Sequence, residues 1–256
     1  MLHTNNKKIM KYAIVMAAGK GTRMKSELPK VLHPVLGRPM IEYVLDALEQ
    51  AEIDKIIVVV GYRSDLVRAH LAPRQNLEFV EQTEQLGAGH AVMACNEVLK
   101  QHTGPVMVVA GDMPMIQVDT IHHMFAQYQS ENQPSCILGT AHKENSEGFG
   151  RIIRNDAGEF HRIVEERDTS PEQKRTTEVN LSYYIFHTPD LLSTLPLLKT
   201  DNANNEYYLV DVPAIMKSQG KHVITVKILN PIEALGINTL EEVEIVEEAM
   251  KRRSLI

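Results

Sequence analysis

The stretch that most constrains this chain lies near its start, over residues 12–30, which read YAIVMAAGKGTRMKSELPK. Its first five residues form an apolar run that predicts a buried β-strand. The run ends in small residues: Ala17, Ala18, Gly19 and Gly21. Glycines directly after a strand let backbone amides approach an anion closely. We therefore expect an anion-binding loop at the carboxyl end of the first strand, where open α/β sheets bind ligands.

Three cations, Lys20, Arg23 and Lys30, accompany this loop and favour a polyphosphate as the anion. The spacing differs from the G-x-x-x-x-G-K-[ST] phosphate loop, and Met24 stands where the dinucleotide fingerprint has its third glycine. A Rossmann dehydrogenase is therefore disfavoured. Taken alone, the loop could also be an ordinary glycine turn bordered by solvated lysines, because such turns are common in α/β folds.

After the loop, apolar runs alternate with segments of helical spacing. Runs at 55–60, 77–80 and 105–110 predict strands, and segments at 40–51, 65–71 and 119–129 predict helices. This alternation implies right-handed crossovers and a mainly parallel sheet. Further along, β-prone runs flank an Asn-Asp-Ala-Gly turn at 155–158 and predict a hairpin. We also expect a strand over 178–186 and helices over 207–217 and 241–253.

Two loops after predicted strands carry polar residues. Gln82 and Gln85 each offer a donor and an acceptor that could read the edge of a base, and Gly87 would let backbone approach it. An ordinary helix N-terminus explains the same residues. Asp112 follows the run at 105–110, and a carboxylate there is well placed to hold Mg²⁺ beside phosphates. A turn aspartate is the simpler alternative.

Composition excludes several classes of function. The net charge of −6 disfavours a nucleic-acid partner, which needs a basic face. No apolar stretch approaches the roughly 18 residues that cross a bilayer, so no membrane partner is expected. Cys95 and Cys136 have no metal or redox spacing, and buried free thiols in a reducing cytoplasm are the default interpretation. Residues 1–11 are expected to be a flexible extension, and residues 12–256 a single domain.

Several separated motifs together resemble one family. The loop A-A-G-K-G-T-R-M followed by L-P-K is similar to that of the sugar-nucleotide pyrophosphorylases, a family of nucleotidyltransferases. Further matches follow in order along nearly the whole chain: Q-T-E-Q-L-G-A-G-H-A at 82–91, G-D-M-P at 111–114, G-F-G-R-I at 148–152, E-V-N at 178–180 and G-I-N at 236–238. They resemble most closely the N-terminal uridylyltransferase domain of GlmU, the branch that makes UDP-N-acetylglucosamine.

The resemblance implies a Rossmann-like α/β nucleotidyltransferase fold, with a mainly parallel mixed sheet, flanking helices and a small β lid over a sugar site. It also implies Mg²⁺-dependent uridylyl transfer from UTP to N-acetylglucosamine 1-phosphate. Arg23 and Lys30 match the catalytic positions, and Asp112 and Asn238 match the metal ligands. The positions that match substrate-binding residues are Ala17, Ala18, Gly19, Gly21, Lys30, Gln82, Gln85, Gly87, Gly150, Glu165, Asn180 and Asn238.

Two of these positions are also consistent with a role outside the site. Glu165 lies in an acidic run and could be a solvated acid, and Asn238 or Thr239 could cap the final helix. The chain also departs from the family at Ala88, Ala110, Leu181 and Ser182; relatives usually carry glycine at position 182. These departures keep another sugar 1-phosphate or nucleotide open (glucose 1-phosphate, dTTP or CTP), as well as a sugar-nucleotide-binding regulator that has lost its chemistry.

Bifunctional relatives continue into a left-handed β-helix that performs acetyl transfer and forms trimers. The hexapeptide repeats of such a domain are absent from this sequence. We therefore expect no β-helix domain, no acetyltransferase activity and no trimer of that kind, and instead a monomer or small homo-oligomer.

Overall fold

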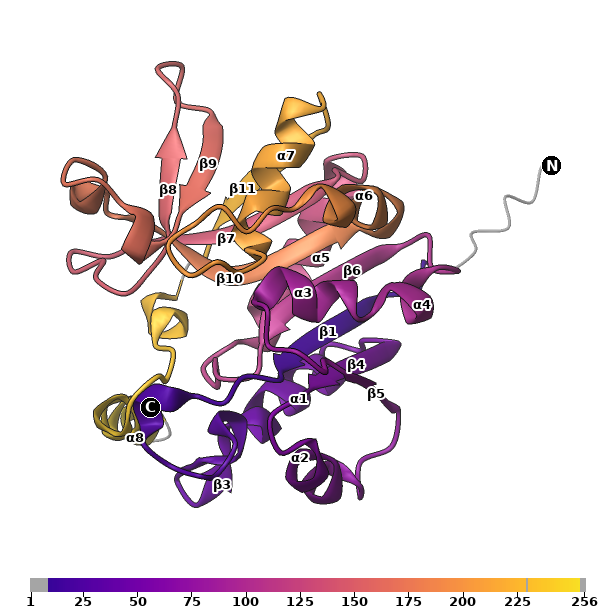
Figure 1. Ribbon diagram of the computed structural model, residues 1–256, viewed down its shortest axis with the longest axis vertical. Helices are drawn as coiled ribbons and strands as arrows, with labels where there is room; N and C mark the ends of the chain where they lie inside the picture. Colours follow the sequence, from indigo (N-terminus) through magenta and orange to yellow (C-terminus); the bar gives the residue numbers. More distant parts are fainter. Residues whose placement is uncertain (1–8, 229, 254–256) are drawn as a thin grey trace.

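Strand β1 (Tyr12–Ala17) pairs in parallel with β4 (Lys55–Val60) on one side and with β6 (Pro105–Ala110) on the other. A computed structural model describes residues 9–228 and 230–253, and in it these strands belong to a nine-stranded sheet (Figure 1). The main path of the sheet runs β11-β7-β10-β6-β1-β4-β5. The remaining strands on that path are β5 (Leu77–Glu81), β7 (Cys136–His142), β10 (Glu178–His187) and β11 (Val223–Lys227).

The predicted α/β fold with a mainly parallel mixed sheet is confirmed. Parallel pairing joins β1, β4, β5 and β6, and also β7 and β11, whereas β10 runs antiparallel to both β6 and β7. A second, two-stranded sheet is formed by β2 (Pro34–Val35) and β3 (Arg38–Pro39). Among the described residues, no left-handed β-helix is found and no helix is long and apolar enough to cross a membrane.

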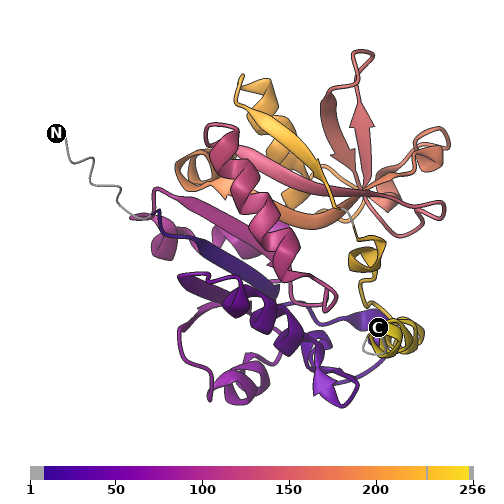
Figure 2. The same ribbon diagram turned by 180° about the vertical axis from the view of Figure 1, so that it is seen from behind.

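Helices cover both faces of the sheet because successive strand residues point to opposite sides. Ala13 and Val15 of β1 pack into one core cluster, whereas Ile14 packs into another. The first cluster includes α1 (Met40–Gln50), α2 (Ser64–Leu71) and α5 (Val118–Ser130), and α5 is seen crossing its face in Figure 2. The second includes α3 (Ala88–Met93), α4 (Asn96–Leu99), α6 (Thr188–Thr194) and α7 (Val212–Ser218).

The predicted hairpin is confirmed as β8 (Arg151–Arg154) and β9 (Phe160–Val164), which stands at one end of the sheet (Figure 1). It joins the main sheet where Val179 of β10 pairs with Arg151. In its turn, Gly158 has a φ of +79°, and its amide donates to the Asn155 carbonyl over 2.9 Å. This matches the prediction that asparagine and glycine would make the turn.

The structure refines two expectations, one for the start of the chain and one for the helix expected over 207–217. Residues 1–8 of the predicted extension lie outside the described residues, while the Lys11 amide donates to the Asp54 carboxylate over 2.8 Å. The α-helix expected over 207–217 begins only at Val212: the Tyr207 amide donates to the Leu86 carbonyl over 2.8 Å, and Leu209–Asp211 form a 3-10 turn that leads into α7.

The final helix α8 (Leu240–Arg253) begins with a capping box. The Glu242 amide donates to the Thr239 hydroxyl over 3.3 Å, and the Thr239 amide donates back to the Glu242 carboxylate over 3.1 Å. Thr239 therefore caps this helix, and the side chain of Asn238 is left for other contacts.

A buried carboxylate joins the segment before α8 to the start of α5. Glu233 is fully buried, and its carboxylate accepts hydrogen bonds from the Thr120 hydroxyl at 2.6 Å and the Gln117 amide at 3.0 Å. Burial raises the pKa of Glu233, since the charged form loses its hydration. This raised pKa makes the stability contribution of Glu233 largest at low pH and reduces it as the pH rises through that value.

We expect Glu233→Ala to lower the free energy of unfolding by about 2–3 kcal/mol, because it leaves two buried donors without an acceptor. Urea unfolding checks this. Glu233→Gln is the matched control: its carbonyl accepts from one donor, its amide donates to the rotatable Thr120 hydroxyl, and most stability is retained. Equal stability of Glu233→Ala and wild type would contradict this role.

Candidate active site

The carboxyl ends of β1, β5 and β6 meet at one cavity of about 480 Å³. Parallel strands end at the same edge of a sheet, so the loops that follow them converge there. Most of the predicted site residues line this cavity: Ala17, Ala18, Gly19, Gly21, Arg23, Lys30, Gln82, Gln85, Gly87, Asp112 and Asn238. We call it the nucleotide-side cavity.

Four side chains from distant parts of the sequence form its polar centre. The Lys30 ammonium contacts the Asp112 carboxylate and donates to the Asn238 amide oxygen over 2.8 Å. The Arg23 guanidinium donates to the same amide oxygen over 2.8 Å. The two residues predicted to hold a metal and the two predicted to be catalytic therefore lie in a single cluster.

The backbone holds this cluster together. The Ile237 amide donates to the Asp112 carbonyl over 3.1 Å, which places Asn238 beside Asp112. Gly236 allows this approach, since a Cβ at that position would lie 2.6 Å from the Met113 sulfur. The G-I-N motif thus has a geometric reason for its glycine, which sequence reasoning left without a role.

The donors present suit a hard divalent cation. Asp112 offers a carboxylate and Asn238 an amide oxygen, and Mg²⁺ typically takes one or two protein oxygens together with phosphates and water. Among residues 9–228 and 230–253, no group of three or more His, Cys, Asp or Glu side chains is arranged to hold a metal. The residues therefore fit a Mg²⁺ ion that shares its coordination with a bound phosphate.

Glycines let the loops around the cavity pack closely. Gly21 has a φ of +67°, and a Cβ there would lie 2.6 Å from Cβ of Lys30. Gly61, at the end of β4, lies directly against Ala18 and Gln85, with a Cβ expected 2.9 Å from each. Sequence reasoning missed Gly61; its position directly after a β-branched run was the available signal.

The loop predicted to read a base is stabilised by its own amides. The Gln82 side chain is buried, and its nitrogen donates to the Gly87 carbonyl over 3.1 Å. The Gln85 nitrogen donates to the Gln82 carbonyl over 3.2 Å. Each of these bonds uses one of the two N–H groups of its amide, so the loop orders the side chains while their carbonyl oxygens and the second N–H of Gln85 remain suited to a ligand.

A second cavity, of about 540 Å³, adjoins the first and shares Met16, Thr22, Arg23, Ala88 and Glu206 with it. We call it the sugar-side cavity. Glu165 lines it, as predicted, together with Arg167, Ser182 and Tyr184. Burial raises the pKa of Glu165, and the nearby Asp168 and Asp211 carboxylates raise it further. Glu165 is therefore a partly buried acid.

Gly150 and Asn180 lie behind the wall of this cavity instead of lining it. The Asn180 amide donates to the Gly150 carbonyl over 2.9 Å, and the Asn180 side chain donates to the Tyr184 hydroxyl over 2.6 Å. A Cβ on Gly150 would lie 3.7 Å from the Glu165 carboxylate. In this geometry both residues support Glu165 and Tyr184, which face the cavity.

Sequence reasoning also missed an ion pair between a buried arginine at the start of β8 and a half-buried glutamate. Arg151 is only 2% exposed, and its guanidinium contacts the Glu166 carboxylate at 2.7 Å. The same carboxylate accepts from the Gly148 amide over 3.2 Å. This pair ties the G-F-G-R segment to the acidic segment that contains Glu165.

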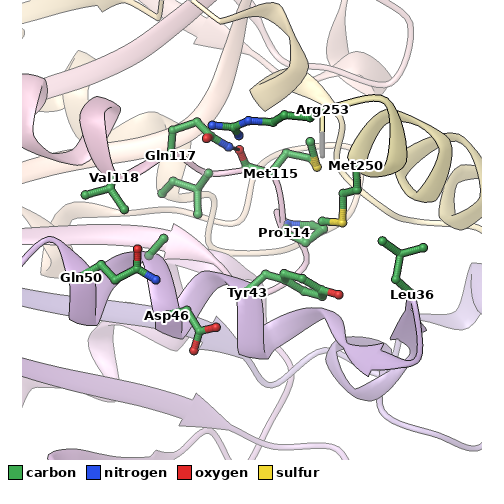
Figure 3. Close-up of a pocket in the computed structure, with 12 residues that line it drawn as sticks. Leu36, Tyr43, Asp46, Gln50, Pro114, Met115, Gln117, Val118, Met250 and Arg253 are labelled. Carbon is green, nitrogen blue, oxygen red and sulfur yellow. Dashed lines mark hydrogen bonds between the residues drawn. The ribbon is translucent and has the colours of Figure 1, made fainter. Parts of the chain in front are cut away.

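A separate cavity of about 480 Å³ lies between α1, the loop after β6 and α8 (Figure 3). Tyr43 and Gln50 of α1 face Met115 and Gln117 across it, and Met250 comes from α8. None of the predicted site residues lines it. The predicted chemistry is therefore gathered at the two adjoining cavities.

Comparison with known proteins agrees with this geometry. Residues 13–202 match the family model described as the MobA-like NTP transferase domain, so the chain belongs to that family of nucleotidyltransferases. It is 42% identical over 243 residues to the bifunctional protein GlmU of Enterococcus faecalis, and 42% identical to that of Lactococcus lactis subsp. lactis. The predicted resemblance to the N-terminal region of GlmU is thereby confirmed.

The alignments cover nearly all of this chain but only part of each GlmU relative. Each alignment covers 95% of this chain but only 52% of the GlmU relative, so the chain spans about half their length. A solved UDP-glucose pyrophosphorylase in complex with UDP-glucose superposes with a TM-score of 0.76, over 95% of this chain and 99% of that one. At 20% identity, that likeness establishes the fold alone.

We expect Gly87→Ala to lower the free energy of unfolding by about 2–4 kcal/mol. Gly87 has a φ of +103°, a region that other residues enter only with strain. A Cβ would also lie 2.7 Å from the Tyr207 carbonyl oxygen. Gly158→Ala is the matched control, since Gly158 has a φ of +79° but open space around it, and should cost about 1 kcal/mol. Urea unfolding measures both losses. If Gly87→Ala and Gly158→Ala lose equal free energy of unfolding, the loop around Gly87 moves aside and the prediction is wrong.

Proposed function

We propose that this protein catalyses Mg²⁺-dependent uridylyl transfer from UTP to N-acetylglucosamine 1-phosphate, giving UDP-N-acetylglucosamine and pyrophosphate. The observation that carries the proposal is the cluster of Lys30, Arg23, Asp112 and Asn238 in the nucleotide-side cavity, from which Arg23 reaches the junction with the sugar-side cavity. A transfer between a nucleotide and a sugar phosphate needs charge-neutralising groups at such a junction. The identity that this chain shares with the GlmU proteins supports the same reaction class.

On the nucleotide side, UTP would lie along the glycine-rich loop. Ala17, Ala18, Gly19 and Gly21 would bring backbone close to the phosphates, and Gln82, Gln85 and Gly87 would border the uracil ring. On the sugar side, the Glu165 carboxylate would accept hydrogen bonds from sugar hydroxyls, and charge assistance makes such bonds strong. Gly150 and Asn180 would support this contact from behind.

In the proposed reaction, an oxygen of the sugar phosphate attacks the α-phosphorus of UTP in line. The new bond joins that oxygen to the α-phosphorus, and the bond between the α-phosphorus and the bridging oxygen to the β-phosphate breaks, releasing pyrophosphate. The nucleophile is already an anion, so no general base is needed, and catalysis rests on positioning and charge neutralisation. Lys30 and Arg23 supply fixed positive charge. Mg²⁺, when bound to Asp112 and Asn238, would neutralise further phosphate charge.

A different sugar or nucleotide is the second candidate for the same chemistry. Ser182 lines the sugar-side cavity where relatives usually carry glycine, and the fold is also that of a UDP-glucose pyrophosphorylase. Glucose 1-phosphate, dTTP and CTP therefore belong in the same assay. A sugar-nucleotide-binding regulator is disfavoured, because simple binding has no need of the Lys30–Asp112 and Arg23–Asn238 contacts together.

The experiment that tests the function is pyrophosphate release from UTP and Mg²⁺, with N-acetylglucosamine 1-phosphate and glucose 1-phosphate run in parallel, and with dTTP and CTP replacing UTP. We expect release with UTP and the N-acetylated sugar, and its loss when EDTA removes the divalent cation. A preference for glucose 1-phosphate would keep the mechanism and replace the sugar. Binding of UTP without any turnover would contradict the enzymatic proposal.

We expect Lys30→Ala and Arg23→Ala each to lower kcat by roughly 10²–10³-fold, the usual effect of losing one fixed charge at a reacting phosphate. Steady-state kinetics measure this, and calorimetric titration with UTP shows whether binding survives. Lys25→Ala is the matched control, because Lys25 is exposed in the same segment and does not line the cavity. Full activity of either Lys30→Ala or Arg23→Ala would remove that residue from the mechanism.

A further inference from the structure

Ser182 combines strained backbone with a place in the wall of the sugar-side cavity. Its φ is +58°, in the left-handed region that residues other than glycine adopt at a cost. Among the described non-glycine residues with positive φ, Ser182 is the one that lies within a β-strand. Strain of this kind persists only where the surrounding structure enforces it, and it concentrates at functional sites.

A bulge in β10 enforces the left-handed conformation of Ser182. Asn180 pairs with Thr140 of β7, and Tyr184 pairs with Leu138, so β10 carries two more residues than β7 over this interval. Gly139 faces the bulge, and a Cβ there would lie 3.2 Å from Cβ of Tyr183. The absent side chain on β7 thus leaves room for the extra residues on β10.

Side chains continue to alternate between core and cavity through the bulge. Leu181 and Tyr183 are buried in the hydrophobic core on one face of the sheet. Ser182, between them, lines the sugar-side cavity beside Tyr184. The Ser182 amide donates to the Asn180 side-chain oxygen over 3.2 Å, which holds the strained residue in place.

We propose that Ser182 is a sugar-binding residue, whose hydroxyl hydrogen-bonds a polar substituent of the pyranose ring of the sugar 1-phosphate. The inference rests on the proposed function of this cavity. Alternation along β10 places Ser182 and the Tyr184 phenol on the same wall, and the bulge holds Ser182 there in a left-handed conformation that glycine would adopt without strain. The Ser182 hydroxyl also hydrogen-bonds the Tyr184 phenol, so it meets the sugar chiefly through its acceptor lone pairs.

The test compares Ser182→Ala and Ser182→Gly in steady-state kinetics and thermal unfolding. Both variants lose the hydroxyl, so both should raise KM for the sugar 1-phosphate about 3- to 10-fold, the usual effect of one hydrogen bond, with kcat and KM for UTP unchanged. Only the glycine variant relieves the backbone strain, so its Tm should rise by about 2–4 °C. A gain in stability together with a loss of sugar affinity separates a binding residue from a structural one.

Glu52→Gly is the matched control, since Glu52 is an exposed residue with a φ of +55° just after α1, remote from both cavities. It should raise Tm and leave KM unchanged. An unchanged KM in both Ser182 variants would overturn the proposal, as would a wild-type KM in Ser182→Gly alone. If the wild-type protein turns over no sugar phosphate, the proposed function fails. Titration of the same variants with UDP-N-acetylglucosamine then decides the role of Ser182, and equal affinities would overturn it.

Discussion

The contacts of Lys30 with Asp112 and Asn238 join three loops that are far apart in the sequence. One loop follows β1, one follows β6, and one precedes α8. Because the carboxyl ends of parallel strands share an edge, β1 and β6 bring the first two loops together. The third loop is held beside them by the hydrogen bond from the Ile237 amide to the Asp112 carbonyl. The site therefore depends on a tertiary closure in which opposite charges offset each other before any ligand is bound.

This local balance explains how an acidic chain can suit an anionic substrate. The net charge of −6 gives no general attraction for phosphates, so attraction must come from cations placed at short range. Arg23 and Lys30 supply them in the nucleotide-side cavity, and Arg23 also lines the sugar-side cavity. The sugar-side cavity adds Glu165, whose carboxylate suits hydroxyl donors, together with Arg167. This distribution of charge supports the proposed placement of the phosphates beside Lys30 and of the sugar beside Glu165.

Much of the fold and of the nucleotide-side cavity could be predicted from the sequence because the signals are local. Each central strand is a short apolar run, and the loop residues that line the cavity stand directly beyond those runs. Gly61, Gly236 and Arg151 escaped prediction because their roles depend on distant partners. Gly61 must be small because of Ala18 and Gln85, and Gly236 because of Met113. The burial of Arg151 is set by how Glu166 folds back onto the hairpin.

The bulge in β10 illustrates a second reason why part of the structure could not be predicted from the sequence. Alternation predicts which faces Leu181 and Tyr183 occupy, but not that two extra residues enter the strand between Asn180 and Tyr184. That outcome requires Gly139 on the neighbouring strand and the Asn180 side chain as an acceptor, neither of which marks a bulge when read alone. Regular pairing would be the more stable arrangement for the strand itself. The bulge interrupts this pairing at the wall of the sugar-side cavity. We interpret it as a feature that lowers the stability of the strand and sets the shape and polarity of the site.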